Sequence, residues 1–365
     1  MKVALLVPGG VDRSGTHRVI PFLLWFIERM AREVELHVFA LKQEPRPGSW
    51  PLLGATVHNI GASPRGARLL AAVAAEHRRG RFDVLHAVWA TPGAAAALLG
   101  TMLGVPVVTH LIGGDLSAFP AQGFGLRTGA GGRLQLRMAL AGSDRLTAPS
   151  TVMVDLARRF GVEPARIPFG VDLERWPAAP PRPRDRSRPA HLLQIATLNP
   201  IKDQPTLLAA VRALRDRGRD VRLAIVGEDT LGGRIQRRAA ELGLEELVTF
   251  HGFLTHAELR PLVEATDVHL VSSLHEADPI ALLEASVAGV PTVGTAVGHL
   301  VDWSPEAALS VPVGDPDALA GAIATLLDDE PRRLAIARAA QARALAEDAA
   351  WTVARALELY RELSG

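Results

Sequence analysis

VHLVSSLHEADPIALLEASVAGVPTVGTAVG, the stretch from Val268 to Gly298, decides the fold of this chain. Residues 268–273 form an apolar, β-branched run, which is typical of a strand buried in a parallel sheet. A polar loop with His275, Glu276 and Asp278 follows directly. The stretch therefore predicts a strand that ends in a charged turn.

A helix is predicted immediately after this turn. Asp278 can serve as its N-cap and Pro279 as its first helical residue, and Gly289 ends it. Val290 to Val293 then begin another strand. The whole stretch thus predicts a βαβ unit.

Two carboxylates flank the start of the predicted helix, Glu276 before it and Glu284 within it. Amides at a helix N-terminus, here those of Ile280, Ala281 and Leu282, carry about half a positive charge and suit a phosphate. A carboxylate only accepts hydrogen bonds, so beside a phosphate it suits hydroxyl donors such as those of sugar rings. The pattern predicts a nucleotide sugar as the ligand. The alternative is that Glu276 is solvated in a loop and Glu284 is buried beside a partner.

Composition limits the classes of function. The chain has 365 residues, of which 48% are hydrophobic, which is enough for roughly two domains with a core each. Its 40 basic and 39 acidic residues give a net charge of +1, so there is no electrostatic argument for nucleic-acid binding. The absence of cysteine excludes disulfides and thiolate metal sites and favours a reducing cytoplasm. The start, MKVALLVPGG, predicts a strand and not a signal peptide.

Short β-branched runs alternate with helical patterns through the first half of the chain, as in a doubly wound α/β domain. The first strand runs into a glycine-rich turn that contains Gly10, and a strand over 105–112 carries His110 and leads to Asp115. Ligands of such sheets bind at the carboxyl ends of the strands, so Gly10, His110 and Asp115 are candidate site residues. For Gly10 the alternative is a tight turn that needs glycine, and for His110 it is a core histidine.

The second half repeats this alternation after a break. Residues 179–190 are dense in proline and arginine, cannot form a helix or a central strand, and predict a solvated linker. A buried strand over 191–198 follows; Thr197 lies near its end, and the loop after it carries Lys202. The final helix is predicted over 350–363.

The spacing E-x7-E within HEADPIALLEASVAGVPTV resembles the signature of retaining glycosyltransferases of the GT-B fold, family four. The resemblance covers nearly the whole chain. It implies two Rossmann-like domains with doubly wound parallel sheets that face a cleft. The implied division is an acceptor-side domain over 1–178, the linker over 179–190, a nucleotide-sugar-binding domain over 191–347, and a helix over 348–365 that returns to the first domain.

The resemblance also implies roles for the second domain. Glu284 would bind the ribose hydroxyls of the donor and Glu276 the hydroxyls of the transferred sugar. Lys202 would hold the diphosphate together with the helix amides. Thr197 stands where the family has an arginine, and its hydroxyl is a weaker phosphate partner than a guanidinium.

In the first domain the resemblance implies that Gly10 lets the backbone approach a phosphate or the acceptor. The family has His-Gly-x-Asp after the strand that here ends near Ile112, and Ile112 stands at the histidine position. His110, two residues earlier, is predicted to lie on the same face of the strand. We therefore predict Glu276, His110 and Asp115 as catalytic residues.

The predicted activity is a metal-independent, retaining transfer of a sugar from a UDP- or GDP-linked donor to a hydroxyl acceptor. No cofactor is predicted, and the Asp315-Pro316-Asp317 string is interpreted as a helix cap and not a metal site. The alternatives are a catalytically silent nucleotide-sugar-binding protein and a nucleotide-sugar epimerase. A cytoplasmic enzyme is expected, with peripheral contact at the inner face of the membrane compatible with the sequence. The sequence predicts neither the acceptor nor the oligomeric state.

Overall fold

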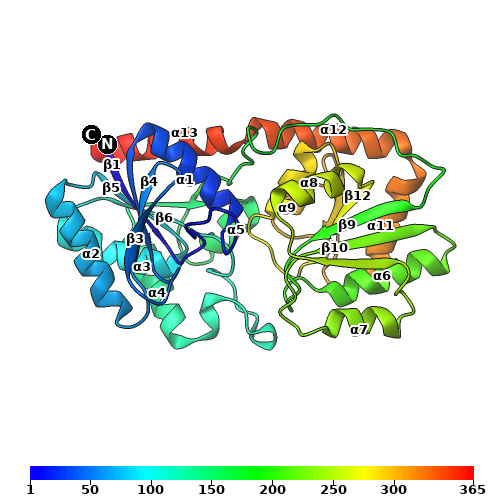
Figure 1. The fold of residues 1–365 in the computed structure, drawn as a ribbon, viewed down its shortest axis with the longest axis horizontal. Helices are drawn as coiled ribbons and strands as arrows, with labels where there is room; N and C mark the ends of the chain where they lie inside the picture. The colour runs from blue at the N-terminus through cyan, green and yellow to red at the C-terminus, as the bar shows by residue number, and fades with distance from the viewer. The chain divides into compact units, whose positions relative to one another are not determined.

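The computed structural model describes residues Met1 to Gly365, which form two compact units. Unit 1 consists of Met1–Asp172 together with Glu347–Gly365, and unit 2 consists of Leu173–Ala346. Each unit is a mainly parallel sheet with helices on both faces (Figure 1). No helix combines the length and the apolar character that a membrane crossing requires.

The sheet of unit 1 has the order β3-β4-β2-β1-β5-β6-β7-β8, and only the β3–β4 pair is antiparallel. Its central strands, β4-β2-β1-β5-β6-β7, have the doubly wound order. From β1 the chain first adds strands on one side of the sheet, and from β5 on it adds them on the other side. The strands are β1 (Lys2–Val7), β2 (Glu35–Ala40), β3 (Gly48–Leu52), β4 (Ala55–Asn59), β5 (Val84–Val88), β6 (Val107–His110), β7 (Arg145–Ala148) and β8 (Ala165–Arg166).

The helices of unit 1 cover both faces of its sheet (Figure 1). Helices α1 (Pro21–Glu33) and α13 (Ala349–Ser364) pack together on one face, where Tyr360 of α13 is hydrogen-bonded to His86 of β5. The opposite face is covered by α2 (Arg65–Arg79), α3 (Ala90–Leu103) and α4 (Ala130–Ala141). The remaining helices are the short turns η1 (Pro120–Gln122) and η2 (Leu126–Thr128), and α5 (Thr151–Arg158).

The sheet of unit 2 is entirely parallel, with the order β11-β10-β9-β12-β13-β14. This is again the doubly wound order, and the reversal lies between β9 and β12. The strands are β9 (Ala190–Ile195), β10 (Val221–Val226), β11 (Val248–Gly252), β12 (Val268–Val271), β13 (Thr292–Thr295) and β14 (Leu309–Val311).

The helices of unit 2 also lie on both faces of the sheet (Figure 1). Leucines and valines of α6 and α11 form one continuous core with the strands, and α9 packs against α12. The helices are α6 (Gln204–Asp216), α7 (Arg234–Glu241), α8 (His256–Ala265), α9 (Ile280–Val287), α10 (His299–Trp303), α11 (Pro316–Asp328) and α12 (Glu330–Ala346).

The predicted fold class of two doubly wound α/β sheets is confirmed, and most differences concern element ends. The helix over 65–79 is found as predicted. Strand β3, with Pro51 as its fourth residue, was not predicted, because proline is tolerated only in an edge strand such as this one. The first helix starts at Pro21 and not near 17, because Val19 pairs with Val11 in an isolated bridge.

The segment over 179–190 is part of unit 2 and differs from the predicted solvated linker, because Arg182, Arg184 and Arg188 contact residues 266 and 267 of the same unit. Both terminal nitrogens of Arg188 donate to the carboxylate of Asp267, at 2.8 and 3.1 Å. The same carboxylate, only 1% exposed as a residue, accepts the amide of His191 at 2.9 Å. A buried carboxylate needs such partners, so the arginine-rich composition supplies an anchor for the strand that follows.

Acid is expected to destabilise the fold through three buried histidines. Burial lowers the pKa of His86, His110 and His269 from 6.5 to about 3. Between these values the unfolded chain binds more protons, so the free energy of unfolding should fall as the pH decreases from 6.5. Each histidine should contribute up to about 1.4 kcal/mol per pH unit.

Denaturant unfolding between pH 6.5 and 4.5 measures this slope. The variant His269→Asn, which keeps a side-chain nitrogen near Thr292, should reduce the slope by about one proton. A free energy of unfolding that stays constant over this range would contradict the expectation.

Candidate functional site

The reversal of strand order in unit 2 brings predicted site residues together. In doubly wound sheets, ligands bind outside the carboxyl ends of the two strands at this reversal. The loop after β9 carries Thr197 and Lys202, and the loop after β12 carries Glu276. Because β9 and β12 are neighbours in the sheet, the two loops share one edge.

Local hydrogen bonds fix the β9 loop. The side-chain oxygen of Asn199 accepts the amides of Ile201 and Lys202, at 3.0 and 3.3 Å, which forms an Asx turn. The hydroxyl of Ser272 donates to the carbonyl of Lys202 at 2.7 Å, and the amide of Leu274 donates to that of Ile201 at 2.8 Å. The backbone of Lys202 is therefore held by both loops.

Lys202 and Glu276 form an ion pair at this edge. The Nζ atom of Lys202 lies 2.5 Å from Oε1 of Glu276, and the hydroxyl of Ser273 donates to the same oxygen at 2.6 Å. The two charged side chains are 25% and 13% exposed, respectively. A ligand can therefore reach both, while partial burial strengthens their electrostatic interactions. A cation suited to phosphate and an acceptor suited to hydroxyls thus lie side by side.

Helix α9 begins later than predicted. Its N-cap is Pro279, and Asp278, the predicted cap, instead lies with Oδ1 2.9 Å from Nε2 of His299. The amide of Ile280 donates to the carbonyl of Asp278, and that of Leu282 to the carbonyl of Pro279, both at 2.9 Å. The first turn is thereby tightly wound, and two of the three predicted phosphate donors, the amides of Ile280 and Leu282, already have backbone acceptors. Phosphate binding by the amides of this turn, including that of Ala281, stays a prediction.

A glycine is required where the loop after β13 meets this turn. Gly298 has φ +48°, and a Cβ atom there would lie 2.9 Å from Cδ of Pro279 and 3.3 Å from the carbonyl oxygen of Glu276. This close approach fixes the path of the backbone on both sides of the charged loop.

Glu284 lies on α9, is 4% exposed, and is held at two points. Nε2 of His256, the first residue of α8, lies 3.1 Å from its Oε1. The indole N–H of Trp176 donates to its backbone carbonyl at 2.8 Å. The structure therefore shows Glu284 buried beside a partner, as the alternative interpretation held, on the same helix that follows Glu276.

Thr197 lies half-buried in the β9 loop, where its carbonyl accepts the side-chain N–H of Gln204 at 3.3 Å. The neighbouring loop comes very close, since a Cβ atom on Gly227 would lie 2.1 Å from the carbonyl oxygen of Ala196. Only glycine fits there, so the loops after β9 and β10 touch through their backbones. Thr197 supplies no positive charge at this point.

Gly10 lies in the turn after β1 of unit 1. It has φ +80°, and a Cβ atom there would lie 2.5 Å from two side-chain carbons of Ile20. The turn itself therefore requires glycine, as the alternative interpretation held, and contact with a ligand stays a prediction.

His110 lies in the interior of unit 1. Its Nδ1 atom is 2.8 Å from the hydroxyl oxygen of Thr147, and its ring meets Phe169 edge-on at 4.6 Å between centroids. Its Nε2 atom is buried without a hydrogen-bond partner, and burial lowers its pKa to about 3. These are the surroundings of a core histidine, and its catalytic role stays a prediction.

Asp115 is buried and connects two backbone segments. Its Oδ2 atom accepts the amide of Ala90, the first residue of α3, and that of Ile112, both at 3.0 Å. Burial raises the pKa of Asp115 from 3.8 to about 7, although these two amides oppose the shift. The contacts indicate that Asp115 positions α3 and the loop after β6.

Two variants separate this structural role of Asp115 from the predicted catalytic one. Asp115→Ala leaves two buried amides unpaired and should lower the free energy of unfolding by about 2–4 kcal/mol. Asp115→Asn keeps an acceptor and removes the titration. Because the folded protein binds the extra proton between pH 3.8 and 7, wild-type stability contains a contribution that falls as the pH rises through this range, and Asp115→Asn should lack it.

Denaturant unfolding and kcat are measured on both Asp115 variants. A structural role predicts that Asp115→Asn retains most of the wild-type kcat. A large loss of kcat in Asp115→Asn with unchanged stability would instead show that Asp115 is catalytic.

The Asp315-Pro316-Asp317 string forms a helix start, as predicted. Oδ1 of Asp315 accepts the amide of Ala318 at 2.9 Å and caps α11. Asp317 pairs with Arg217 at 2.9 Å. The two carboxylates therefore have separate partners.

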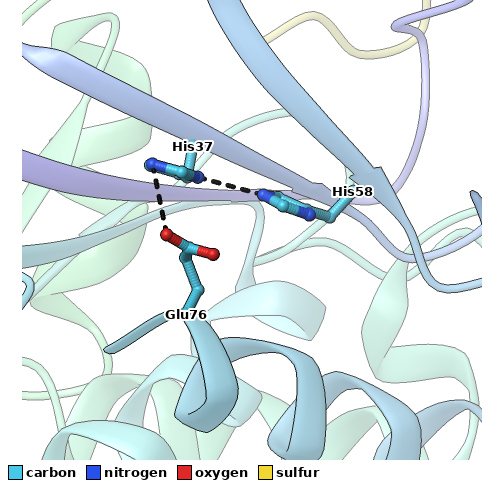
Figure 2. Close-up of side chains that lie close together, drawn as sticks. All are labelled: His37, His58 and Glu76. Carbon is cyan, nitrogen blue, oxygen red and sulfur yellow. Dashed lines mark hydrogen bonds and ion pairs between the residues drawn. The ribbon is translucent and has the colours of Figure 1, made fainter. Parts of the chain in front are cut away.

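His37, His58 and Glu76 of unit 1 offer metal-ligand atoms within 4.8 Å of one another. Figure 2 shows the two imidazoles end to end, with Nδ1 of His37 3.0 Å from Nε2 of His58. The ring planes are 12° apart and the centroids 5.3 Å apart, so the two nitrogens point directly at each other. A cation between them would lie about 1.5 Å from each, half of that 3.0 Å, whereas zinc–nitrogen bonds are about 2.0–2.1 Å.

Hydrogen bonds account fully for this group. Nε2 of His37 lies 3.0 Å from Glu35, so it carries a hydrogen, and Nδ1 can then accept from His58. Nδ1 of His58 lies 3.2 Å from the hydroxyl of Ser49, which completes a chain of donors and acceptors. Glu76 is neutralised by Lys2 at 2.8 Å and by Arg79 at 3.1 Å. We therefore interpret the group as a polar network and not as a metal site.

Sequence reasoning missed three residues of the unit 2 site. Ser273 contacts Glu276, and His256 and Trp176 contact Glu284. Ser273 could have been found from its place at the end of the strand. No local pattern indicates that Trp176 or His256 lies beside Glu284, because these contacts join distant parts of the chain.

Two family descriptions match the chain. "Glycosyl transferases group 1" matches residues 179–343, and "Glycosyl transferase 4-like domain" matches residues 20–170. The first match contains Lys202, Glu276 and Glu284, and the second contains His110 and Asp115.

The chain is also similar to individual proteins. A D-inositol 3-phosphate glycosyltransferase of Kineococcus radiotolerans is 27% identical, over 98% of this chain and 92% of that protein. The MMP alpha-(1->4)-mannosyltransferase of Mycolicibacterium hassiacum is 32% identical, over 74% of this chain and 67% of that protein. The match to a D-inositol 3-phosphate glycosyltransferase of Corynebacterium glutamicum, at 31% identity, takes in 58% of this chain and about half, 55%, of that protein.

Solved structures share the fold. The sucrose-phosphate synthase of Thermosynechococcus elongatus superimposes with a TM-score of 0.85 at 20% identity, over 100% of this chain and 99% of that one. The Anabaena protein HepE, solved in complex with UDP, gives a TM-score of 0.77 at 18% identity, over 99% and 100% of the two chains.

Proposed function

This chain belongs to the group 1 glycosyl transferases of the GT-B fold, and we propose that it transfers a sugar from a UDP- or GDP-linked donor to a hydroxyl acceptor. The donor would bind to unit 2, at the edge where the strand order reverses. The transfer would retain the configuration of the sugar and need no metal ion.

The observation that carries this proposal is the Lys202–Glu276 ion pair next to α9. The 2.5 Å contact shows that an ammonium group and a carboxylate meet at the carboxyl ends of β9 and β12. We propose that the donor diphosphate replaces Glu276 as the partner of Lys202, and that the helix amides near Ala281 complete the anion site. Glu276 would then accept hydrogen bonds from the transferred sugar, and Glu284 from the ribose.

The chemistry follows from where charge develops. As the bond between the anomeric carbon and the diphosphate oxygen breaks, negative charge collects on the diphosphate, where Lys202 and the amides stabilise it. The acceptor oxygen forms the new bond from the same face, and its proton passes to the departing phosphate oxygen. The products are the glycosylated acceptor and a nucleoside diphosphate.

A second candidate is a catalytically silent protein that binds nucleotide sugars. Thr197 favours it, because a neutral hydroxyl cannot stabilise the diphosphate as a bidentate guanidinium would. In such a protein Lys202 would be the only side-chain cation among the proposed diphosphate ligands.

Turnover of UDP- and GDP-linked sugars, with and without a panel of hydroxyl acceptors, tests these proposals. We expect release of nucleoside diphosphate that depends on an acceptor, and NMR of the product should show the configuration of the donor sugar. Conversion of the donor sugar without an acceptor would indicate an epimerase. A donor that raises the melting temperature but is never turned over would indicate the silent protein.

The metal-independent part of the proposal has its own measurement. Turnover should be unchanged when EDTA is added to enzyme and substrates that have been freed of divalent ions. Loss of turnover with EDTA and its recovery with Mg²⁺ or Mn²⁺ would contradict a metal-independent mechanism.

A further inference from the structure

We propose that His256 is a positioning residue for the donor: it fixes the carboxylate of Glu284 in the orientation that receives the ribose hydroxyls. This inference rests on the proposed function and extends it to a residue outside the family signature. The imidazole belongs to α8, a different helix from the one that carries Glu284.

The contact between the two side chains has a defined direction. Nε2 of His256 lies 3.1 Å from Oε1 of Glu284. The distance is that of an ion pair, and because a carboxylate only accepts, Nε2 is the atom that must carry the hydrogen facing it. Each carboxylate oxygen has two acceptor positions, so Oε2 and the second position of Oε1 stay open to hydroxyl donors.

His256 is itself rigidly held. It is the first residue of α8, whose N-terminus is fixed by a reciprocal capping box between Thr255 and Glu258. Its ring meets that of Trp176 at 61°, with 5.5 Å between the centroids. Trp176 is 1% exposed, and the guanidinium group of Arg260 lies over its ring, with Cζ 5.0 Å from the centroid. The imidazole is therefore positioned by its helix and by a buried indole.

Trp176 also fixes the backbone of Glu284. Its indole N–H donates to the Glu284 carbonyl at 2.8 Å, and the same carbonyl accepts the amide of Ala288 at 3.1 Å. Backbone and carboxylate of Glu284 are thus held by two side chains that touch each other. Such an arrangement lowers the cost of ordering the carboxylate when a ligand binds.

The exposures of the two side chains indicate their separate roles toward the ligand. The side chain of Glu284 is 5% exposed, whereas that of His256 is 34% exposed. A nearly buried carboxylate needs a polar or charged partner, and the imidazole of His256 lies at ion-pair distance from it. The ribose hydroxyls would add further donors to a carboxylate that is already oriented, so His256 should affect binding and not the chemical step.

The test compares His256→Ala, His256→Gln and Thr255→Ala in the full chain. His256→Ala should raise the donor KM about tenfold and leave kcat within about twofold. His256→Gln should restore the wild-type KM, because the glutamine amide nitrogen can donate from nearly the same place as Nε2. Thr255→Ala removes the capping box and should lower the melting temperature of the protein, with a smaller rise in donor KM than His256→Ala causes, because the imidazole itself remains.

Binding of nucleoside diphosphates locates the effect at the ribose. UDP and GDP, and their 2′,3′-dideoxy counterparts, are titrated by calorimetry against wild type and His256→Ala. The variant should bind the ribonucleotide about tenfold more weakly and should bind the dideoxy compound as wild type does.

The outcomes are distinguishable. The role of His256 would be overturned if His256→Ala weakened the ribonucleotide and the dideoxy compound equally, or if His256→Gln were as impaired as His256→Ala. Either result would leave the proposed function intact as long as the wild-type protein turns over a donor. A Thr255→Ala variant with the same rise in KM would show that His256 acts only through the stability of α8. Wild-type protein that binds neither UDP nor GDP would remove the proposed function and this inference with it.

Discussion

Glu276→Ala is expected to lower kcat by about 10²–10³-fold, with the donor KM unchanged or slightly lower. In the proposed mechanism Glu276 binds the hydroxyls of the transferred sugar as the bond to the diphosphate breaks, so its loss acts mainly on the transition state. The variant also removes the partner of Lys202, which lies 2.5 Å away, and so frees the ammonium group for the diphosphate. Steady-state kinetics with saturating acceptor separates the two constants.

Glu276→Gln is the matched variant, because it keeps the shape of the side chain and loses the charge. It should retain more activity than Glu276→Ala. A fully active Glu276→Ala protein would remove Glu276 from the mechanism, and a large rise in donor KM with unchanged kcat would assign it to ground-state binding instead.

Glu284→Ala is expected to weaken donor binding about 100-fold, with a smaller change in kcat. Two ribose hydroxyls that donate to one carboxylate correspond to hydrogen bonds of about 1.5 kcal/mol or more each, and every 1.4 kcal/mol is a factor of ten in affinity. The variant should still fold, because Trp176 binds the backbone carbonyl of residue 284 and alanine is favourable in a helix. Calorimetric titration with UDP and GDP measures the loss.

The double variant of Glu284 and His256 supplies the control for this prediction. If His256 acts through Glu284, His256→Ala should cause no further loss in a Glu284→Ala background. Additive losses would show that the two side chains contact the donor independently. Unchanged nucleotide binding by Glu284→Ala alone would contradict the assignment of Glu284 to the ribose.

Much of the fold could be predicted because its signals are local. Runs such as 2–7 and 221–226 are buried strands in a parallel sheet, where apolar β-branched residues are favoured at nearly every position. The helix over 65–79 shows a clear apolar stripe and was predicted with its observed ends. Two elements were not predicted: β3, which contains a proline, and α7, over 234–241, which is mostly polar.

The site could be predicted only as far as its residues are neighbours in sequence. Glu276 and Glu284 were predicted from their spacing, and Lys202 from the resemblance to the family. The predicted cap of α9 was wrong because Asp278 is taken by His299, a long-range contact that no helix-start pattern contains. His256 was missed for the same reason, because its contact with Glu284 joins two helices that are distant in sequence.

The discontinuity of unit 1 sets the order in which the chain can fold during synthesis. Unit 2 is a single stretch of chain, whereas unit 1 also needs Glu347–Gly365, which is translated after the whole of unit 2. Until α13 emerges, His86 lacks Tyr360 and the turn at Gly170 lacks the backbone of Asp348, which a Cβ on Gly170 would approach to 2.2 Å. Residues 1–172 can therefore reach their final packing only after the whole of unit 2 has been synthesised.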